Sequence, residues 1–388
     1  MRRILGFGAA VAALTVWAAV PAAAAAGWSQ QATPNPPVSV HDGLSAVWCA
    51  SASACTAVGF YDTSAGNQFG LVEHWNGSTW TVQSNPSGHG ELAGVACTSA
   101  ASCIAVGSAG PGSALLAESW NGTRWTAQPV PVPSGASSAS LNGVECSGAA
   151  SCLAAGTFAG TNGVQHVLIE RWNGSTWSVQ AVPSRAGQLY GISCLSAASC
   201  FAVGTDGVTG LVLAEHWNGS SWVVQGTPAL PHIEGGPPAS AQLSGVSCSG
   251  TVCMATGSLS GPFSTPESTP VRTLGELWNG AKWVLQTTPD AGAGTGGSGG
   301  GTAELNGVSC VSATSCTATG AFTSDNDFPV IVMAARWNGT KWANVAITDP
   351  SGGGGSSLNA VSCRTTACTA VGYYDNASHV QVSLAERN

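Results

Sequence analysis

Seven closely spaced cysteine pairs recur along the chain and account for all fourteen cysteines. Five pairs read C-x5-C and two read C-x4-C, and the first cysteines of successive pairs are 48 to 62 residues apart. The pairs are Cys49–Cys55, Cys97–Cys103, Cys146–Cys152, Cys194–Cys200, Cys248–Cys253, Cys310–Cys316 and Cys363–Cys368. A chain with such a period folds as a stack or ring of similar units, because each unit buries its apolar surface against the next.

The same short phrases surround every pair. In the second unit, L-x-x-V-x-C (92–97) is followed by C-x-A-x-G (103–107), an apolar stretch ending E-x-W-N-G (118–122), and W-x-x-Q (125–128). Each phrase is short, rich in Val, Ala, Leu and Trp, and bounded by turn-forming residues, which predicts four strands, a to d. Four strands in about 50 residues, repeated radially, form the blade of a β-propeller.

The two ends of the chain decide how many blades there are. W-N-G occurs six times, and the seventh unit stops at Asn388 before its fourth strand. Near the other end, Trp28 to Gln31 form a lone W-x-x-Q phrase that supplies this strand. We therefore predict an all-β, seven-bladed propeller over residues 27–388, with four antiparallel strands per blade. Its N-terminal strand closes the last blade and leaves no open sheet edge.

The first 26 residues have the form of a signal peptide, with Arg2 and Arg3 before an apolar run (4–20) and small residues at 22–26. No second apolar run of about 18 residues follows, so we predict a secreted, extracellular protein without a membrane span. In an exported chain, each cysteine pair is expected to form a disulfide across its own a–b hairpin. Zinc would need four ligands, and no partner His or Cys recurs beside the pairs.

Two further features of the repeat are interpreted as structural. In W-N-G-S-T-W, a Gly77-Ser78 turn would place Trp75 opposite Trp80, so the N-x-S/T sequons at these turns are read as turn chemistry. A glutamate recurs two residues before the strand-c tryptophan, and we expect it to hydrogen-bond between blades; Ala335 replaces it in unit six. Its copies are Glu73, Glu118, Glu170, Glu215, Glu276 and Glu386.

Variation between units concentrates on one face of the predicted ring. The a–b and c–d turns are short and share one face, here called the turn face; the b–c and d–a connections form the loop face. The insertions lie on the loop face, at 129–140, 226–242, 258–272, 287–304 and 348–357. Most acidic loop residues share it: Asp42, Asp62, Glu91, Asp206, Glu234, Glu267, Asp290, Glu304, Asp325, Asp327, Asp349 and Asp375. Repeat proteins commonly bind their partners on such a variable face.

Blades 6, 7 and 1 carry the candidate ligand-binding patch. Their b–c connections combine aromatic side chains with acids and amides, which suits recognition of sugars or cations, although ordinary polar hairpins with half-buried aromatics would look the same. The candidate residues are Tyr61, Asp62, Asp325, Asp327, Tyr374 and Asp375. A Ca²⁺ ion near these acids is the one cofactor considered, without an EF-hand-like motif to support it.

A second candidate site is the mouth of the central channel, at the strand-a position just before the first cysteine. That position is small in five units (Ala96, Ser193, Ser247, Ser309 and Ser362). Trp48 and Glu145 interrupt the column. We interpret these two residues as candidates for lining a mouth of the central channel, the alternative being local packing.

The repeat resembles secreted bacterial propellers with C-x5-C and W-N-G-x-x-W repeats, over the whole chain after the signal peptide. Its length is also similar to Kelch blades, and its tryptophan-rich turns are similar to BNR/Asp-box repeats. Both motifs are incomplete, because Trp75 occupies the Asp position of an Asp-box and strand b has a single glycine, such as Gly59, where Kelch has two. Neither family's activity therefore carries over.

Composition and motifs narrow the function classes. A formal net charge of −8 argues against nucleic acid, which needs a basic surface. No H-E-x-x-H or P-loop sequence occurs, and the G-x-S-x-G string at 296–300 lies inside a glycine-rich tract that we interpret as a flexible connector. Arg171, Arg336 and Arg387 share one strand position, so they do not look like the arginine cluster of a sialidase. We expect a monomeric, non-catalytic scaffold that binds a glycan or a protein on the loop face. The alternatives are an envelope structural or assembly factor and a glycoside hydrolase-like enzyme.

Overall fold

The structure is a computed structural model. It describes residues 27–86, 88–110, 114–183, 186–233, 237–261, 271–289, 301–323, 329–350, 354–365 and 367–388. The predicted signal peptide lies outside these residues. No helix in the described ranges is long and apolar enough to cross a membrane.

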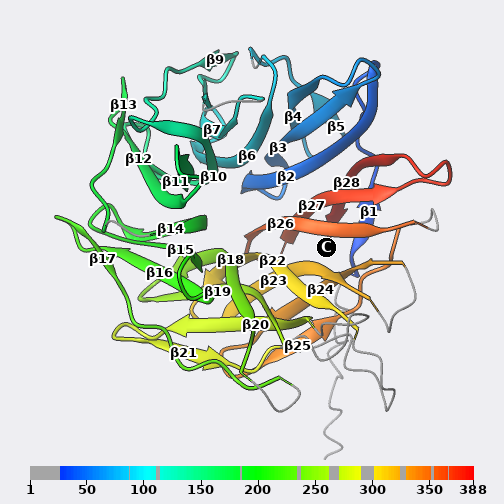
Figure 1. Cartoon of the computed structure of the whole chain (residues 1–388). Helices are drawn as coiled ribbons and strands as arrows, with labels where there is room; N and C mark the ends of the chain where they lie inside the picture. Colours follow the sequence, from blue (N-terminus) through cyan, green and yellow to red (C-terminus); the bar gives the residue numbers. More distant parts are fainter. Residues whose placement is uncertain are drawn as a thin grey trace, which may run out of the picture.

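Seven sheets of four antiparallel strands form a ring, as predicted (Figure 1). Blade 1 comprises β2 (Ser39–Ser51), β3 (Ala54–Thr63), β4 (Gln68–Trp75) and β5 (Trp80–Val82). Blade 2 comprises β6 (Glu91–Ser99), β7 (Ser102–Ser108), β8 (Leu115–Trp120) and β9 (Trp125–Ala127). Blade 3 comprises β10 (Ala136–Gly148), β11 (Ser151–Gly160), β12 (Gln165–Trp172) and β13 (Trp177–Val179). Blade 4 comprises β14 (Gly187–Ser196), β15 (Ser199–Asp206), β16 (Val212–Trp217) and β17 (Trp222–Val224).

The remaining blades follow the same order from the axis outward. Blade 5 comprises β18 (Ser240–Ser249), β19 (Val252–Ser260), β20 (Val271–Trp278) and β21 (Trp283–Gln286). Blade 6 comprises β22 (Ala303–Ser312), β23 (Ser315–Phe322), β24 (Ile331–Trp337) and β25 (Trp342–Val345). Blade 7 comprises β26 (Ser356–Arg364), β27 (Ala367–Asp375), β28 (Gln381–Arg387) and, as its outer strand, β1 (Ser29–Gln31). Ser29 pairs with Arg387 and Gln31 with Ala385, so the predicted closure by the N-terminal strand is confirmed.

Within each blade, the expected cross-strand contacts are present. All seven cysteine pairs form disulfides between directly opposed residues of strands a and b, with Cα–Cα distances of 3.9–4.0 Å. Trp75 lies opposite Trp80 with ring centroids 5.7 Å apart, and five other blades repeat this pair. At the turn between them, the Asn76 side-chain oxygen accepts hydrogen bonds from the backbone of Ser78 and Thr79, which supports its interpretation as turn chemistry.

Every innermost strand carries a β-bulge just after its buried leucine. In blade 3 the register shifts between Leu141 and Gly143, and a Cβ atom on Gly143 would lie 2.9 Å from the Tyr190 carbonyl oxygen of blade 4. Neighbouring blades therefore approach most closely at this level, where the position holds Gly or Ala. The bulges surround an axial cavity of about 180 Å³, lined by residues of all seven blades.

A column of serines links successive blades on the turn-face side of the axial constriction that the bulges form. The hydroxyl oxygens of Ser193, Ser247, Ser309 and Ser362 accept hydrogen bonds from the backbone N–H of the first cysteine in the next blade, at 2.9–3.1 Å. These serines therefore connect the blades, and their side chains are used in packing the ring. The other members of the column, Trp48, Ala96 and Glu145, cannot provide a hydroxyl at this place.

Ser247→Ala is expected to lower the free energy of unfolding by about 1–2 kcal/mol, because the Cys310 N–H loses its acceptor inside the ring. Chemical denaturation with the disulfides intact measures the change. Ser249→Ala, two residues further along the same strand, is a matched control. Equal stability of the Ser247→Ala variant and the wild type would contradict the assigned role.

The repeated strand-c glutamates are buried, but three of them lack the interblade hydrogen bonds that the repeat predicts. Glu170 and Glu276 are 0 % exposed and Glu386 is 1 % exposed. Neither carboxyl oxygen of these three residues has a hydrogen-bond partner in the described part of the chain. The prediction of interblade hydrogen bonds is therefore wrong for them. Burial instead raises the pKa of Glu170 and of Glu276 to about 8, which keeps these carboxyl groups neutral at neutral pH.

Candidate functional site

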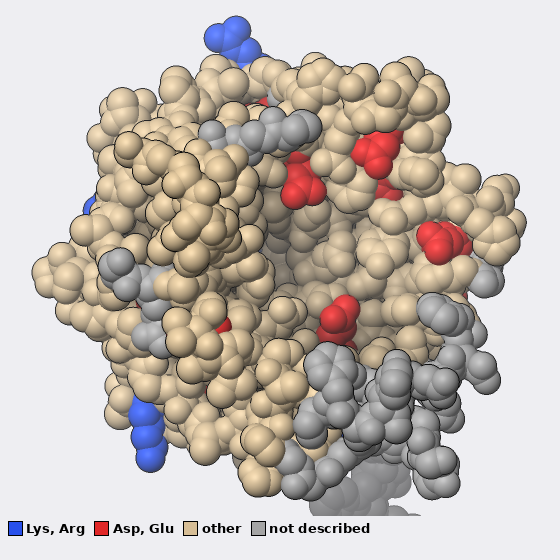
Figure 2. All heavy atoms as spheres, viewed as in Figure 1, with Lys and Arg blue, Asp and Glu red and all other residues tan. Residues whose placement is uncertain are grey.

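Carboxyl groups surround the axis at the loop-face end of the ring. Glu91 and Glu304 hold equivalent places in blades 2 and 6, each one residue before the buried leucine of strand a. Figure 2 shows a hollow at the centre of this face with Asp and Glu around it, while Lys and Arg are visible only at the rim. We call this depression the central hollow and consider with it seven residues at the loop-face ends of strands a and b: Asp62, Glu91, Gln188, Tyr190, Glu304, Tyr373 and Asp375.

The central hollow holds two acidic groups, and within each of them a neighbouring carboxylate raises the pKa of one member. Burial and the neighbouring charge of Asp62 both raise the pKa of Glu91, at the junction of blades 1 and 2. Burial raises the pKa of Glu304, against the effect of a hydrogen bond from Asn306. Burial, Glu304 and Asp375 together raise the pKa of the Tyr373 hydroxyl, at the junction of blades 6 and 7. Glu91, Glu304 and Tyr373 therefore hold their protons to a higher pH than the same groups would in water.

Amide and hydroxyl groups extend the polar surface around the hollow. The Tyr190 hydroxyl donates a hydrogen bond to Gln188 Oε1 at 2.8 Å. Both side chains are partly exposed at the loop-face end of β14 in blade 4. In the described ranges of the innermost strands, the only Lys or Arg is Arg364, at the turn-face end of β26. Among the described residues of these inner strands, the hollow thus offers acceptors and neutral donors without a cation.

The residues of the predicted ligand-binding patch on blades 6, 7 and 1 do not share one environment. Tyr61 packs against the core between blades 7 and 1 and stacks on Phe69 at 5.4 Å, whereas Tyr374 packs against the core between blades 6 and 7. Asp62 and Asp375 join the two acidic groups of the hollow. Asp325 and Asp327 lie outside the described residues.

Three other loop-face acids support the backbone. Asp42 is 1 % exposed and accepts hydrogen bonds from the Ser39 hydroxyl and the Ser383 N–H, both at 2.7 Å, so it joins blade 1 to blade 7. Asp206 accepts from two backbone N–H groups of its own turn. Asp349 accepts hydrogen bonds from the Ser356 hydroxyl and the Val332 N–H. The presence of an acid on the loop face was therefore not enough to identify a binding residue.

The two channel-mouth candidates lie on the opposite side of the axial constriction. Trp48 and Glu145 belong to strand a of blades 1 and 3 and are both partly exposed. The Arg364 guanidinium of blade 7 lies 4.8 Å from the centre of a Trp48 ring. Burial raises the pKa of Glu145 to about 7, and the charge of Arg364 opposes that rise. Sequence reasoning missed Arg364, whose position next to a disulfide cysteine carries no signal.

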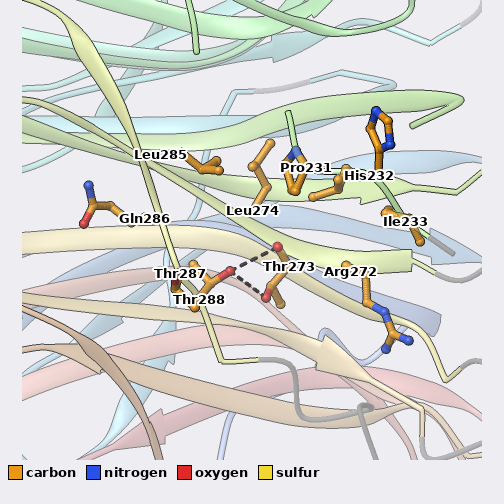
Figure 3. Close-up of a pocket in the computed structure, with 11 residues that line it drawn as sticks. Pro231, His232, Ile233, Arg272, Thr273, Leu274, Leu285, Gln286, Thr287 and Thr288 are labelled. Carbon is orange, nitrogen blue, oxygen red and sulfur yellow. Dashed lines mark hydrogen bonds between the residues drawn. The ribbon is translucent and has the colours of Figure 1, made fainter. Parts of the chain in front are cut away.

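A separate pocket of about 430 Å³ lies on blade 5, away from the ring centre (Figure 3). Its floor is held by hydrogen bonds between Thr273 and Thr288, and Leu274 and Leu285 provide apolar walls. His232, Ile233 and Arg272 lie at one end. Three of the five predicted insertions flank this blade, which was the available signal for the pocket. Residues 234–236 and 262–270, next to it in the chain, lie outside the described residues.

No group of three or more His, Cys, Asp or Glu side chains in the described ranges has a geometry suited to a metal ion. The considered Ca²⁺ ion stays a prediction, because Asp325 and Asp327 lie outside the described residues. The carboxyl groups of the described acids are spread around the hollow or committed to backbone contacts.

Comparisons with known proteins establish the architecture. No family model and no curated protein matches this chain. Among solved structures, YCF48 from Cyanidioschyzon merolae matches with a TM-score of 0.50 and 12% identity, covering 93% of this chain and 98% of the other. A polysaccharide lyase PL25 ulvan lyase matches with a TM-score of 0.51 and 10% identity, covering 89% and 94%. The polysaccharide lyase Uly1 matches with a TM-score of 0.51 and 8% identity, covering 92% and 91%. At these identities the likeness shows the fold alone.

Proposed function

We propose that the protein is an extracellular, non-catalytic scaffold that binds a hydroxyl-rich glycan in the central hollow of its loop face. One observation carries the proposal: carboxyl, amide and tyrosine hydroxyl groups from several blades gather around a hollow in which the described residues place no cation. Seven disulfides support an extracellular location, because such bonds persist in oxidising compartments.

The charge of the hollow selects among glycans. Sugar hydroxyls donate hydrogen bonds to carboxylates and amide oxygens, and Tyr190 and Tyr373 add aromatic surface. A carboxylated or sulfated chain would bring its own negative charge beside Glu91, Glu304 and Asp375, which costs free energy in a partly buried site. The ligand class is therefore a neutral or amine-bearing saccharide rather than a polyanion.

An enzyme is the second candidate, supported by the Asp62–Glu91 pair. A carboxyl group with a raised pKa beside another carboxylate is the arrangement that glycosidases use for acid–base work. The same panel of saccharides distinguishes the two functions, since a scaffold returns its ligand intact and a hydrolase releases new reducing ends.

Binding is tested with a glycan array and a cell-wall pull-down using the purified protein. The double variant Glu91→Gln, Glu304→Gln is expected to weaken binding of an amine-bearing saccharide by about tenfold or more, because two charge-assisted hydrogen bonds are lost. Neutral saccharides should lose less. Adding salt should weaken the amine-bearing ligand most.

Lys341→Gln is the control, since Lys341 is exposed on a c–d turn of the opposite face. Retention of full affinity by the double variant would remove the hollow as the binding site. Preferential binding of sulfated or uronic chains by the wild type would reject the proposed ligand class, and binding to a wall protein in place of a glycan would favour a protein partner.

A further inference from the structure

Three consecutive blades depart from the serine column that links the rest of the ring. In blades 4 to 7, a serine hydroxyl accepts the N–H of the following blade's cysteine. Blades 1, 2 and 3 place Trp48, Ala96 and Glu145 there. Within the described chain, no hydrogen bond joins Glu145 to Cys194. A purely structural role at this position would favour serine. The aromatic Trp48 and the charged Glu145 therefore require another explanation.

A third side chain completes the cluster from across the ring closure. Arg364 follows the first cysteine of blade 7, and its guanidinium covers a Trp48 ring at 4.8 Å. A cation over an indole face is held by the ring quadrupole, which fixes where the guanidinium points. Its one hydrogen bond within the described residues, from Nη1 to the neighbouring Cys363 carbonyl oxygen, is long at 3.4 Å. Most of its donors are therefore available for a ligand.

Glu145 and Arg364 influence each other without touching. Each changes the other's titration electrostatically, yet no ion pair within 4.0 Å joins these two described residues. Trp48, Glu145 and Arg364 are all partly exposed. The mouth therefore presents an acceptor and a forked cationic donor with a gap between them, beside an indole ring.

We propose that the turn-face mouth of the axial channel is a second binding site, for a small carboxylate that carries a hydrogen-bond donor on the adjacent carbon. The carboxylate binds the Arg364 guanidinium, whose fork matches its two oxygens. The adjacent amine or hydroxyl group donates to Glu145, and the ligand's carbon skeleton contacts the exposed edge of Trp48. A 2-amino or 2-hydroxy acid has this arrangement. The site lies across the axial constriction from the central hollow and is independent of glycan binding there.

The test is saturation-transfer NMR with a panel of alanine, phenylalanine, glutamate, lactate and mandelate, each added alone to the purified protein. Ethylamine and propanol, which lack a carboxylate, are the negative probes. At least one 2-amino or 2-hydroxy acid is expected to bind. Arg364→Gln should raise its dissociation constant by about tenfold or more, as expected for loss of a charged hydrogen-bond partner. Glu145→Gln should reduce binding less, and should affect amino acids more than hydroxy acids.

Glu145→Ser separates binding from folding, because it restores the residue that blades 4 to 7 use. The variant should have a thermal midpoint at or above that of the wild type while losing affinity. Arg171→Gln, a partly exposed strand-c arginine, should bind normally. The proposal fails if no panel member binds the wild type, if Arg364→Gln binds equally well, or if Glu145→Ser lowers the midpoint and keeps affinity.

Discussion

The free energy of unfolding is expected to fall as the pH rises from about 5 to about 8, and Glu170→Gln is expected to remove part of that fall. Glu170 is 0 % exposed in strand c of blade 3, and burial raises its pKa to about 8. Burial also raises the pKa of Glu73 and Glu276 to about 8 and that of Glu386 to about 7. These four carboxyl groups thus hold protons in the folded ring that the unfolded chain releases near pH 4.5.

The direction follows from the bound protons. Below the unfolded pKa both states are protonated, and the full stability is present. Between that value and the folded pKa, the folded state binds more protons, so each group lowers the free energy of unfolding by about 1.4 kcal/mol per pH unit. Glutamine keeps the shape of the neutral carboxyl group and cannot ionise. The variant should therefore match the wild type near pH 5 and exceed it at pH 8 by on the order of a few kcal/mol.

Urea titrations at pH 5, 6.5 and 8, with the disulfides intact, measure the effect. Lys341→Gln, which changes an exposed lysine, should keep the wild-type slope. Parallel curves for Glu170→Gln and the wild type would mean that Glu170 is already ionised in the folded ring. Blade 6 already carries Ala335 at the equivalent position, so the ring does not need a carboxyl group in every blade.

The architecture could be predicted from the sequence because the repeat is a one-dimensional pattern. Fourteen cysteines in seven pairs, six W-N-G turns and one lone W-x-x-Q phrase specify blade number, disulfides and closure without any contact information. The same regularity misled the interpretation of the glutamates. A polar residue repeated in a strand interior suggested a hydrogen bond, but Glu170 is accommodated as a neutral acid.

The candidate sites were only partly accessible to sequence reasoning. The loop face could be assigned from insertions, yet a backbone-supporting acid such as Asp42 and a hollow acid such as Glu91 look alike in sequence. Trp48 was visible as an interruption of a regular column. Its partner Arg364 was not, because the two residues meet only through closure of the ring. Contacts between sequence-distant blades depend on geometry that a local pattern does not contain.

Gly204→Ala is expected to destabilise the ring by about 4 kcal/mol or more, or to prevent folding. Gly204 ends the C-x-A-x-G phrase of β15, opposite the bulge in β14. A Cβ atom there would lie 1.9 Å from the Gln188 carbonyl oxygen and 2.9 Å from the Leu189 Cα atom. Both are backbone atoms of the innermost strand, so no side chain can move aside. The equivalent glycines of the other blades have the same contact: Gly59, Gly107, Gly156, Gly257, Gly320 and Gly372.

Gly148→Ala is the matched control, because a Cβ atom at Gly148 meets nothing within 4 Å and its backbone needs no left-handed conformation. It should be neutral or slightly stabilising, since alanine reduces the freedom of the unfolded chain. Thermal and denaturant unfolding of the two variants at one pH measure the difference. A Gly204→Ala variant as stable as Gly148→Ala would show that strand a can move away from strand b at the bulge. No rigid contact at this glycine would then fix the spacing of the inner strands. Since that spacing sets the width of the axial channel between the two proposed sites, the width would be adjustable.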